Sequence, residues 1–342
     1  MDLNSAPDAD PANRPPDLLA RAARFSRYAR LLLASDSDLA GSGEFGTPWD
    51  APRMRARLAC LRQAGASLER ALRRLRKEVM LSLIARDLAG LADLQEVVVT
   101  ATTLAETALD AAVCGLHSEL VQQYGEPRGE ESCAPQQLHV IGMGKLGGRE
   151  LNVSSDIDLI LLYPEEGETT GARTLSNHEF FTRLARKLSA TLSEMTADGF
   201  VFRVDLRLRP YGESGPLVCS FEMLESYLIT QGREWERYAW IKGRVLTGNR
   251  ESEVMELVRP FVFRRHLDYS AFASMRELHA QIRFEVKRRD IAENIKLGPG
   301  GIREIEFIVQ LFQLIRGGRD SQLRQQPTLA VLPLLAERRL LS

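Results

Sequence analysis

The stretch that decides the fold reads IGMGKLGGRELNVSSDIDLILLY and spans residues 141–163. Its glycine pair, Gly147 and Gly148, is followed by Asp156 and Asp158 at the start of an apolar run. Because alternate residues of a β-strand share a face, the pattern predicts two carboxylates on one side of a strand, about 7 Å apart. Carboxylates at that spacing repel unless a cation lies between them, and hard divalent cations prefer oxygen ligands. The sequence therefore predicts a divalent metal site here.

The residues around the glycine pair predict a phosphate contact. Gly147 and Gly148 can expose backbone N–H groups to an anion, and Lys145 adds a positive charge beside them. We expect Ser154 or Ser155 to help hold phosphate oxygens, although a turn or cap is an equally good interpretation of either serine. A metal ion beside a bound phosphate is typical of phosphoryl or nucleotidyl transfer.

Asp205 is the third informative carboxylate. Residues 200–208 alternate between polar and apolar side chains, which predicts a strand with Asp205 on its polar face. If this strand lies beside the Asp158 strand, three aspartates converge and can hold two divalent ions. Arg207 and Arg209 would then add cationic contacts to phosphate oxygens.

Two other phosphate-binding motifs are disfavoured by the spacing. Residues 142–147 satisfy G-x-G-x-x-G, but a dinucleotide-binding fold requires a crossover helix directly after the glycines. Residues 148–155 are too few for that helix, because such crossovers need a dozen residues or more. A P-loop is excluded because no Lys-Ser or Lys-Thr follows the second glycine.

Composition points to an ordinary globular protein. The chain has 342 residues, enough for two or three domains, and a net charge of −1 that gives no indication of a nucleic-acid or membrane partner. No run of 18 apolar residues predicts a membrane span. The four cysteines and five histidines lack metal-ligand spacing, and the cysteines suggest no disulfide framework, so we expect a cytoplasmic location.

Periodicity divides the chain into three expected regions. Residues 1–125 are predicted to be helical, with long amphipathic helices over 53–90 and 93–123. Residues 126–219 hold the short strands and the motif. The strand over 158–163 is continuously apolar after its first residue, which predicts burial on both faces. Residues 220–342 return to helix. The densest basic cluster, Arg73–Lys77, is interpreted as a solvated helix face. Further helices are predicted over 177–198, 220–231, 233–246, 250–263, 270–293 and 301–317.

At these residues the chain resembles the nucleotidyltransferase superfamily of polymerase beta. The order Leu146-Gly147-Gly148, Asp156-Ile157-Asp158 and then Asp205 matches that superfamily's pattern. A closer similarity is to the glutamine synthetase adenylyltransferase/adenylyl-removing family. It rests on GMGKLGGRELNVSSDIDLI, FRVDLRLRPYGESGPL, EWERYAWIKGR and GPGGIREIEFIVQ. The resemblance implies an α+β fold: a polymerase-beta-like core, a small mixed sheet with helices, flanked by helical regions.

The resemblance also implies an activity. The family enzyme has two catalytic halves, and this chain is similar to the amino-terminal one, which removes AMP from a tyrosine of glutamine synthetase by phosphorolysis. Asp156, Asp158 and Asp205 would hold Mg²⁺ or Mn²⁺ beside phosphate and an adenine nucleotide. A P-II signal protein is an implied partner. With one catalytic core in the sequence, we expect a fragment that ends before the second catalytic half.

Other interpretations stay open at this stage. The chain could instead add AMP to a protein, or its helices could dock glutamine synthetase and a P-II protein around an inert core. Arg303, Glu306 and Gln310 fall on one polar face of the predicted helix over 301–317, opposite Ile305, Ile308 and Phe312. That polar face could contact the active site or solvent.

Overall fold

The computed structural model describes residues 15–41, 45–264, 294–296, 298 and 300–341. The chain divides into two compact units. The first comprises 1–116, 150–156 and 187–204, and the second comprises 117–149, 157–186 and 205–342. The helix expected over 270–293 lies outside the described residues, and the three-region division stays a prediction.

The first unit is built mainly from helices. Its elements are α1 (Pro15–Phe25), α2 (Arg27–Ser35), α3 (Asp38–Gly41), α4 (Ala51–Gln63), α5 (Leu68–Leu88) and the first part of α6 (Leu94–Tyr124). The single helix expected over 53–90 is wrong, since α4 ends before α5 begins. Gly65 adopts a left-handed backbone with φ of +89°, and the Ser67 side chain caps α5 by accepting from the Arg70 N–H. These two residues stop one helix and start the next.

Helix α5 corrects the expectation of a solvated basic face. Arg73 and Arg76 are 3% and 9% exposed. Arg73 donates to the carbonyl oxygens of Gly199 and Glu194, both at 2.8 Å. Arg76 lies over the ring of Phe200, with 4.9 Å to the ring centroid. The basic cluster therefore holds the segment after α8 in place by hydrogen bonds and cation–π contacts.

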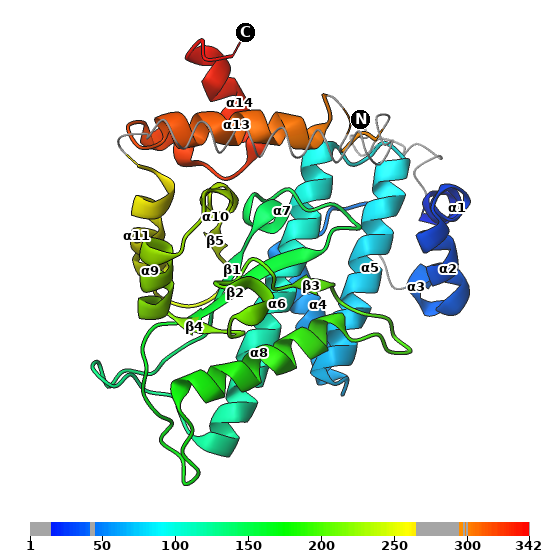
Figure 1. Ribbon diagram of the computed structural model, residues 1–342. Coiled ribbons are helices and arrows are strands. Elements are labelled where there is room, and N and C mark those ends of the chain that lie inside the picture. Colours follow the sequence, from blue (N-terminus) through cyan, green and yellow to red (C-terminus); the bar gives the residue numbers. More distant parts are fainter. Residues whose placement is uncertain (1–14, 42–44, 265–293, 297, 299, 342) are drawn as a thin grey trace, which may run out of the picture. The chain divides into compact units, whose positions relative to one another are not determined.

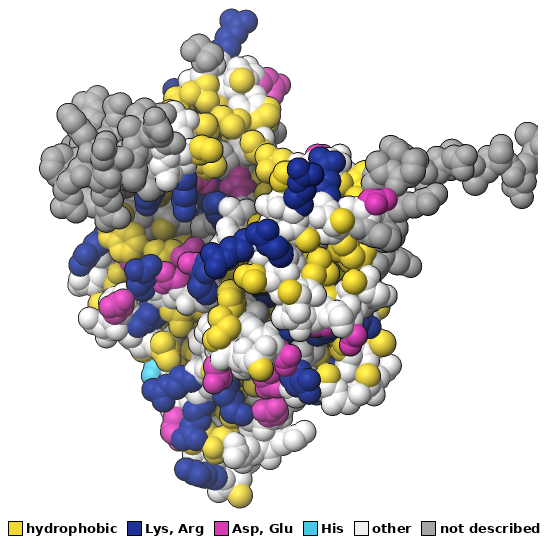
Figure 2. All heavy atoms as spheres, turned by 90° about the vertical axis from the view of Figure 1, so that its right-hand side faces the viewer, with side chains coloured by type: hydrophobic (Ala, Val, Ile, Leu, Met, Phe, Trp, Pro, Cys, Tyr) yellow, Lys and Arg dark blue, Asp and Glu magenta, His cyan; other side chains and the backbone are white. Residues whose placement is uncertain are grey.

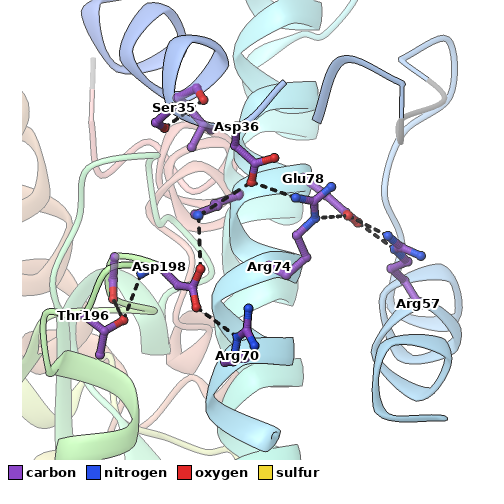
Figure 3. Close-up of polar contacts among 11 residues, drawn as sticks. Ser35, Asp36, Arg57, Arg70, Arg74, Glu78, Thr196 and Asp198 are labelled. Atoms are coloured by element: carbon purple, nitrogen blue, oxygen red, sulfur yellow. Dashed lines mark hydrogen bonds and ion pairs between the residues drawn. The ribbon is translucent and has the colours of Figure 1, made fainter. Parts of the chain in front are cut away.

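Other charged side chains of α5 form an alternating chain of ion pairs with residues of neighbouring segments (Figure 3). Glu78 is almost fully buried and pairs with both Arg57 and Arg74 at 2.7 Å. Asp36 accepts from Arg74 at 2.7 Å, and Lys77 lies 3.8 Å from both Asp36 and Asp198. Arg70 completes the chain at Asp198, 3.2 Å away. Each carboxylate thus lies between two cations, which compensates the cost of partial burial.

Helix α6 is long and apolar enough, by length and composition, to cross a membrane. However, 56% of its most apolar window is buried inside the protein. A buried core helix passes the same test, so this single helix is weak evidence for a membrane span.

The second unit contains a five-stranded sheet. Strands β1 (His139–Gly142) and β2 (Ile157–Tyr163) lie side by side (Figure 1). They run antiparallel, with Ile141 opposite Ile160. Strand β5 (Arg244–Val245) pairs antiparallel with β1, β4 (Cys219–Ser220) pairs parallel with β2, and β3 (Val204–Asp205) is the neighbour of β2. The mixed sheet with surrounding helices confirms the expected α+β class.

The apolar run of β2 is buried as predicted. Every residue from Leu159 to Tyr163 is at most 1% exposed. The strand expected over 200–208 is wrong, because only Val204 and Asp205 pair within the sheet. The alternation of side chains there does not reflect a long strand, since Arg207 and Arg209 bend back to bond their own loop.

Helices surround the sheet of the second unit. They are one-turn α7 (Gly144–Gly147), α8 (Asn177–Ser193), α9 (Phe221–Thr230), α10 (Glu234–Trp240), α11 (Glu251–Val262), α13 (Ile302–Arg316) and α14 (Thr328–Glu337). One core cluster joins Ile141 and Ile160 of the sheet to Leu224 of α9, Val258 of α11 and Leu314 of α13. The helix expected over 233–246 is shorter than predicted, since the chain turns after Trp240 to form β5.

The surface carries mixed charge. On the face drawn in Figure 2, dark blue Lys and Arg side chains are interspersed with magenta Asp and Glu and with yellow hydrophobic side chains. This mixture accords with the near-zero net charge of the whole sequence.

Candidate functional site

The glycine turn packs directly against Asp158 in the second unit. Asp158 is the second residue of β2, and its carbonyl oxygen accepts the Met143 N–H at 2.9 Å. Gly144 follows with φ of +52°, and a Cβ atom there would lie 3.3 Å from Asp158 Oδ2. A larger residue at Gly144 would meet both backbone strain and this carboxylate. The turn is thereby held at the Asp158 side chain.

Gly147 is required for close packing beneath this turn. A Cβ atom at Gly147 would lie only 1.6 Å from the carbonyl oxygen of Lys242, so no other residue fits without a backbone shift. Arg244 fixes the same turn, since its Nε donates to Gly147 O and its Nη2 to Leu146 O, both at 3.0 Å. The residues just before and within β5 therefore support the turn from one side.

The backbone N–H groups of the glycine pair have partners inside the turn. Gly147 N–H donates to Met143 O at 3.1 Å, and Gly148 N–H donates to Gly144 O at 2.9 Å. This gives Gly147 a packing role that the sequence pattern did not reveal. The expected phosphate contact of Gly147 and Gly148 stays a prediction, as does that of half-buried Lys145 on α7.

Asp205 and Asp158 lie near one shared cation, Arg207. The Arg207 Nε donates to both carboxylate oxygens of Asp205, at 3.0 and 2.9 Å, and its backbone N–H donates to Asp205 Oδ1 at 2.9 Å. These hydrogen bonds lower the pKa of Asp205 below its usual range. The charges of Asp205 and, to a smaller extent, Asp158 raise the pKa of Arg207. Asp205 is thus held ionised at neutral pH.

Asp156 has different neighbours, which belong with it to the first unit. Strand β2 begins at Ile157, so Asp156 precedes the strand and the predicted side-chain alternation does not include it. Its carboxylate accepts a hydrogen bond from Arg203 Nε. Arg203 also donates to Ser154 O at 3.0 Å, which ties Asp156 to the preceding turn.

The two candidate serines form that turn. Asn152 Oδ1 accepts from the Ser155 hydroxyl at 2.8 Å and from the Ser154 hydroxyl and N–H, both at 3.2 Å. Both serines therefore have the local turn-forming contacts that are typical of Asn-Ser sequences. Their contact with phosphate stays a prediction.

Two residues of the second unit offer side-chain donors that suit a divalent cation. Asp158 and Asp205 offer the carboxylate oxygens that Mg²⁺ or Mn²⁺ prefers, and Arg207 already supplies positive charge to both. Within the part of the chain that the structure describes, however, no group of three Asp, Glu, His or Cys side chains could hold a metal ion. Because Asp156 belongs to the other compact unit, a site that joins it to Asp158 and Asp205 stays a prediction, as does metal binding.

Arg209 has contacts that hold its own loop closed. Its guanidinium donates to three backbone carbonyl oxygens: Leu206 at 2.8 Å, Glu213 at 3.1 Å and Gly215 at 3.3 Å. These bonds shape the loop that follows Asp205. A contact between Arg209 and phosphate stays a prediction.

Glu306 on α13 faces the protein and bonds Lys242. The Lys242 Nζ, in a side chain that is 5% exposed, donates to Glu306 Oε1 at 2.6 Å. Ile305 and Ile308, which the sequence places opposite this polar face, are 42% and 38% exposed. Arg303 is exposed and close enough for its charge to lower the pKa of Tyr238, although burial raises that pKa overall.

Lys242 and Arg244 are the residues that the sequence argument missed at this site. Both lie in the motif EWERYAWIKGR, which had been read only as a mark of resemblance. The helix predicted over 233–246 covers both residues, whereas in the structure they follow α10. Their usable signal was their positive charge, because cations beside a glycine turn can bond its carbonyl oxygens.

A small mixed sheet, an aspartate packed against a glycine turn, and a second aspartate on the next strand together define a nucleotidyltransferase core. The chain belongs to the glutamate-ammonia ligase adenylyltransferase family, whose model matches residues 22–259. A second model, PII-uridylyltransferase, matches residues 276–342.

Curated relatives agree with this family. Each of three carries the name bifunctional glutamine synthetase adenylyltransferase/adenylyl-removing enzyme. The protein of Chromobacterium violaceum is 63% identical over 81% of this chain and 31% of its own length. The protein of Nitrosomonas europaea is 54% identical over 96% of this chain and 36% of its own length. The protein of Aromatoleum aromaticum is 53% identical over 99% of this chain and 36% of its own length. The chain thus spans about a third of the length of these relatives.

Proposed function

We propose that this chain removes AMP from an adenylylated tyrosine of glutamine synthetase by phosphorolysis, giving ADP and the unmodified tyrosine. The observation that carries the proposal is that Asp158 packs against the glycine turn while Asp205 lies on the neighbouring strand, β3. The names of the relatives, which include adenylyl removal, support the substrate.

In this reaction an oxygen of inorganic phosphate attacks the AMP phosphorus in line, and the bond to the tyrosine oxygen breaks. The phenolate leaves and takes a proton from water. Phosphate is already an anion near neutral pH, so no strong general base is required. The hydrogen bonds from Arg207 lower the pKa of Asp205, which makes this carboxylate a weak base, so its proposed role is that of a metal ligand and a fixed negative charge.

Asp158 and Asp205, with Asp156 as the expected third ligand, would hold Mg²⁺ or Mn²⁺. The bound ion would neutralise charge on the phosphate and on the departing phenolate. The Arg207 side chain is 71% exposed, so it can leave Asp205 and donate to phosphate oxygens instead. The glycine turn then sets how close the phosphate comes to Asp158.

The test is incubation with AMP-modified glutamine synthetase, phosphate and Mg²⁺, with ADP as the measured product. Asp158→Asn and Asp205→Asn should each lower ADP formation by about 100-fold or more, since each removes a charge from the reaction centre. Glu179→Gln, on a surface ion pair with Arg183, is the matched control and should stay near normal. Near-normal rates in the aspartate variants would refute the proposal.

Addition of AMP from ATP is the second candidate, because the relatives' name includes an adenylyltransferase activity as well. Unmodified glutamine synthetase with ATP and Mg²⁺ should remain unmodified if removal is the activity of this chain. Loss of both reactions, with binding of glutamine synthetase retained, would point to a docking module. The match to a PII-uridylyltransferase model supports, as a further proposal, a P-II regulatory partner. A cytoplasmic setting is likewise proposed, because the four cysteines are free thiols.

A further inference from the structure

A cavity of about 240 Å³ lies in the second unit, apart from the glycine turn and its aspartates. It is formed where the end of α10 and one side of α11 meet the segment after α13. Its residues come from these three places: Trp240, Ile241, Met255, Val258, Arg259, Val262, Phe263, Ser321, Arg324 and Gln326. Its volume is below the 300 Å³ or so of a typical drug-sized pocket, so it suits a small metabolite.

The floor of the cavity is apolar and rigid. Trp240 is 5% exposed, and Val258 and Val262 are each 1% exposed. Gly243 packs so closely on the Trp240 ring that a Cβ atom there would lie 2.7 Å from Trp240 Cε3. The indole is therefore fixed in place, which favours stacking or apolar contact with the flat part of a ligand.

The polar part of the lining is cationic. Arg324 is positioned by its Nε, which donates to Gly317 O at 2.6 Å, and by the Phe263 ring, 5.5 Å from its guanidinium carbon. Arg259 is exposed on α11 and makes no side-chain hydrogen bond or ion pair with the described residues. Among the described residues, the charged side chains that line the cavity are Arg259 and Arg324, and none is acidic.

We propose that this cavity binds a small organic anion, with its phosphate or carboxylate group at Arg259 and Arg324 and its apolar part on Trp240. A guanidinium that is already held in place loses little freedom on binding, and it offers N–H groups in the fork geometry that carboxylates and phosphates match. Ser321 and Gln326 add hydrogen-bonding groups at the rim. The site is separate from the proposed transfer reaction and does not depend on it.

The experiment measures binding of phenyl phosphate to the full chain by calorimetry, with phenylacetate, inorganic phosphate and phenol as comparison ligands. We expect a Kd on the order of 1 mM for phenyl phosphate, and binding at least about tenfold weaker for inorganic phosphate and for phenol. If phenylacetate binds as tightly as phenyl phosphate, the site accepts organic anions in general. If phenylacetate does not bind, the site is selective for phosphate esters. Both outcomes support the proposal.

Variants locate the site. Arg259→Gln should weaken phenyl phosphate binding by about tenfold, and Arg259→Lys should weaken it less, since the charge remains. Arg319→Gln, an exposed arginine nearby that does not line the cavity, is the control and should bind as the original chain does. The proposal is overturned if phenyl phosphate does not bind at 10-fold above that Kd, about 10 mM, or if Arg259→Gln binds it unchanged.

Discussion

Lys242 touches two parts of the candidate site at once: its ammonium donates to Glu306 on α13 at 2.6 Å, and its carbonyl oxygen lies against Gly147. One residue thereby connects α13 to the glycine turn that packs on Asp158. The position of the turn consequently depends on a helix about 160 residues further along the chain.

Replacing Glu306 by Gln should destabilise the second unit by about 2–3 kcal/mol, because it removes the carboxylate that compensates the buried Lys242 ammonium. The measurement is thermal or denaturant unfolding. The double variant Lys242→Met/Glu306→Gln has no buried ammonium to compensate. Its loss of unfolding free energy should therefore be smaller than the sum of the losses in the single variants Lys242→Met and Glu306→Gln. Additive losses would show that the two side chains are not coupled.

Gly147→Ala should lower stability by roughly 3 kcal/mol and abolish ADP formation, since the new methyl group overlaps the Lys242 carbonyl oxygen. Circular dichroism melts and the ADP assay check both effects. Gly46→Ala is the control, because nothing lies within 4 Å of a Cβ atom at Gly46. If Gly147→Ala melts like the original chain, the close packing described here is wrong.

Arg207→Gln should strengthen Mn²⁺ binding by about fivefold while weakening catalysis. Arg207 lowers the pKa of Asp205 and hydrogen-bonds the carboxylate oxygens that would otherwise ligate a divalent ion. A metal ion must therefore displace the Arg207 side chain to bind Asp205. Electron paramagnetic resonance of free Mn²⁺ measures the affinity. Arg183→Gln, whose partner is Glu179, serves as the comparison. Weaker Mn²⁺ binding in Arg207→Gln would argue against metal at these aspartates.

His139 should make stability fall as pH decreases from about 6.5 towards 4. Its Nδ1–H donates to Gln137 O at 3.0 Å and its Nε2 accepts the Arg250 N–H at 3.1 Å, so both ring nitrogens have partners that suit the neutral form. Burial lowers the pKa of His139 to about 4. The unfolded chain, with the ordinary pKa near 6.5, takes up the proton first, which favours unfolding in that window.

The contribution of neutral His139 to the free energy of unfolding is complete above pH 6.5. It is lost as the pH falls from 6.5 to about 4, and the total loss is roughly 3 kcal/mol. Unfolding free energies of the original chain and of His139→Asn, measured from pH 7.5 to pH 4, isolate it from titrating carboxylates. The gap between the two curves should narrow with decreasing pH. Parallel curves would assign the pH dependence to other groups.

Arg73→Met should lower the free energy of unfolding by about 3 kcal/mol, because the carbonyl groups of Gly199 and Glu194 lose a buried charged donor. Arg70→Met removes only an exposed ion pair with Asp198 and should change the unfolding free energy by about 0.5 kcal/mol or less. Urea unfolding of the two variants side by side makes the comparison. Equal losses would restore the interpretation of this cluster as a solvated face.

The sequence by itself indicated where the glycine turn and its following strand lie, and the resemblance to known families indicated the α+β class. The segment between the glycines and β2 was too short for a crossover helix, and the continuous apolar run of β2 predicted burial on both faces; the antiparallel pairing of β1 with β2 came from the structure. These are local properties, since the strand period and the turn length depend only on neighbouring residues.

Only the tertiary structure decided how charged residues are used. Periodicity says which residues share a face, but it does not say what that face meets; hence Arg73 is buried on α5, while Ile305 is exposed on α13. The Lys242–Glu306 pair and the shared cation of Asp158 and Asp205 likewise join residues far apart in the sequence. Such contacts arise from long-range packing, which no local pattern encodes.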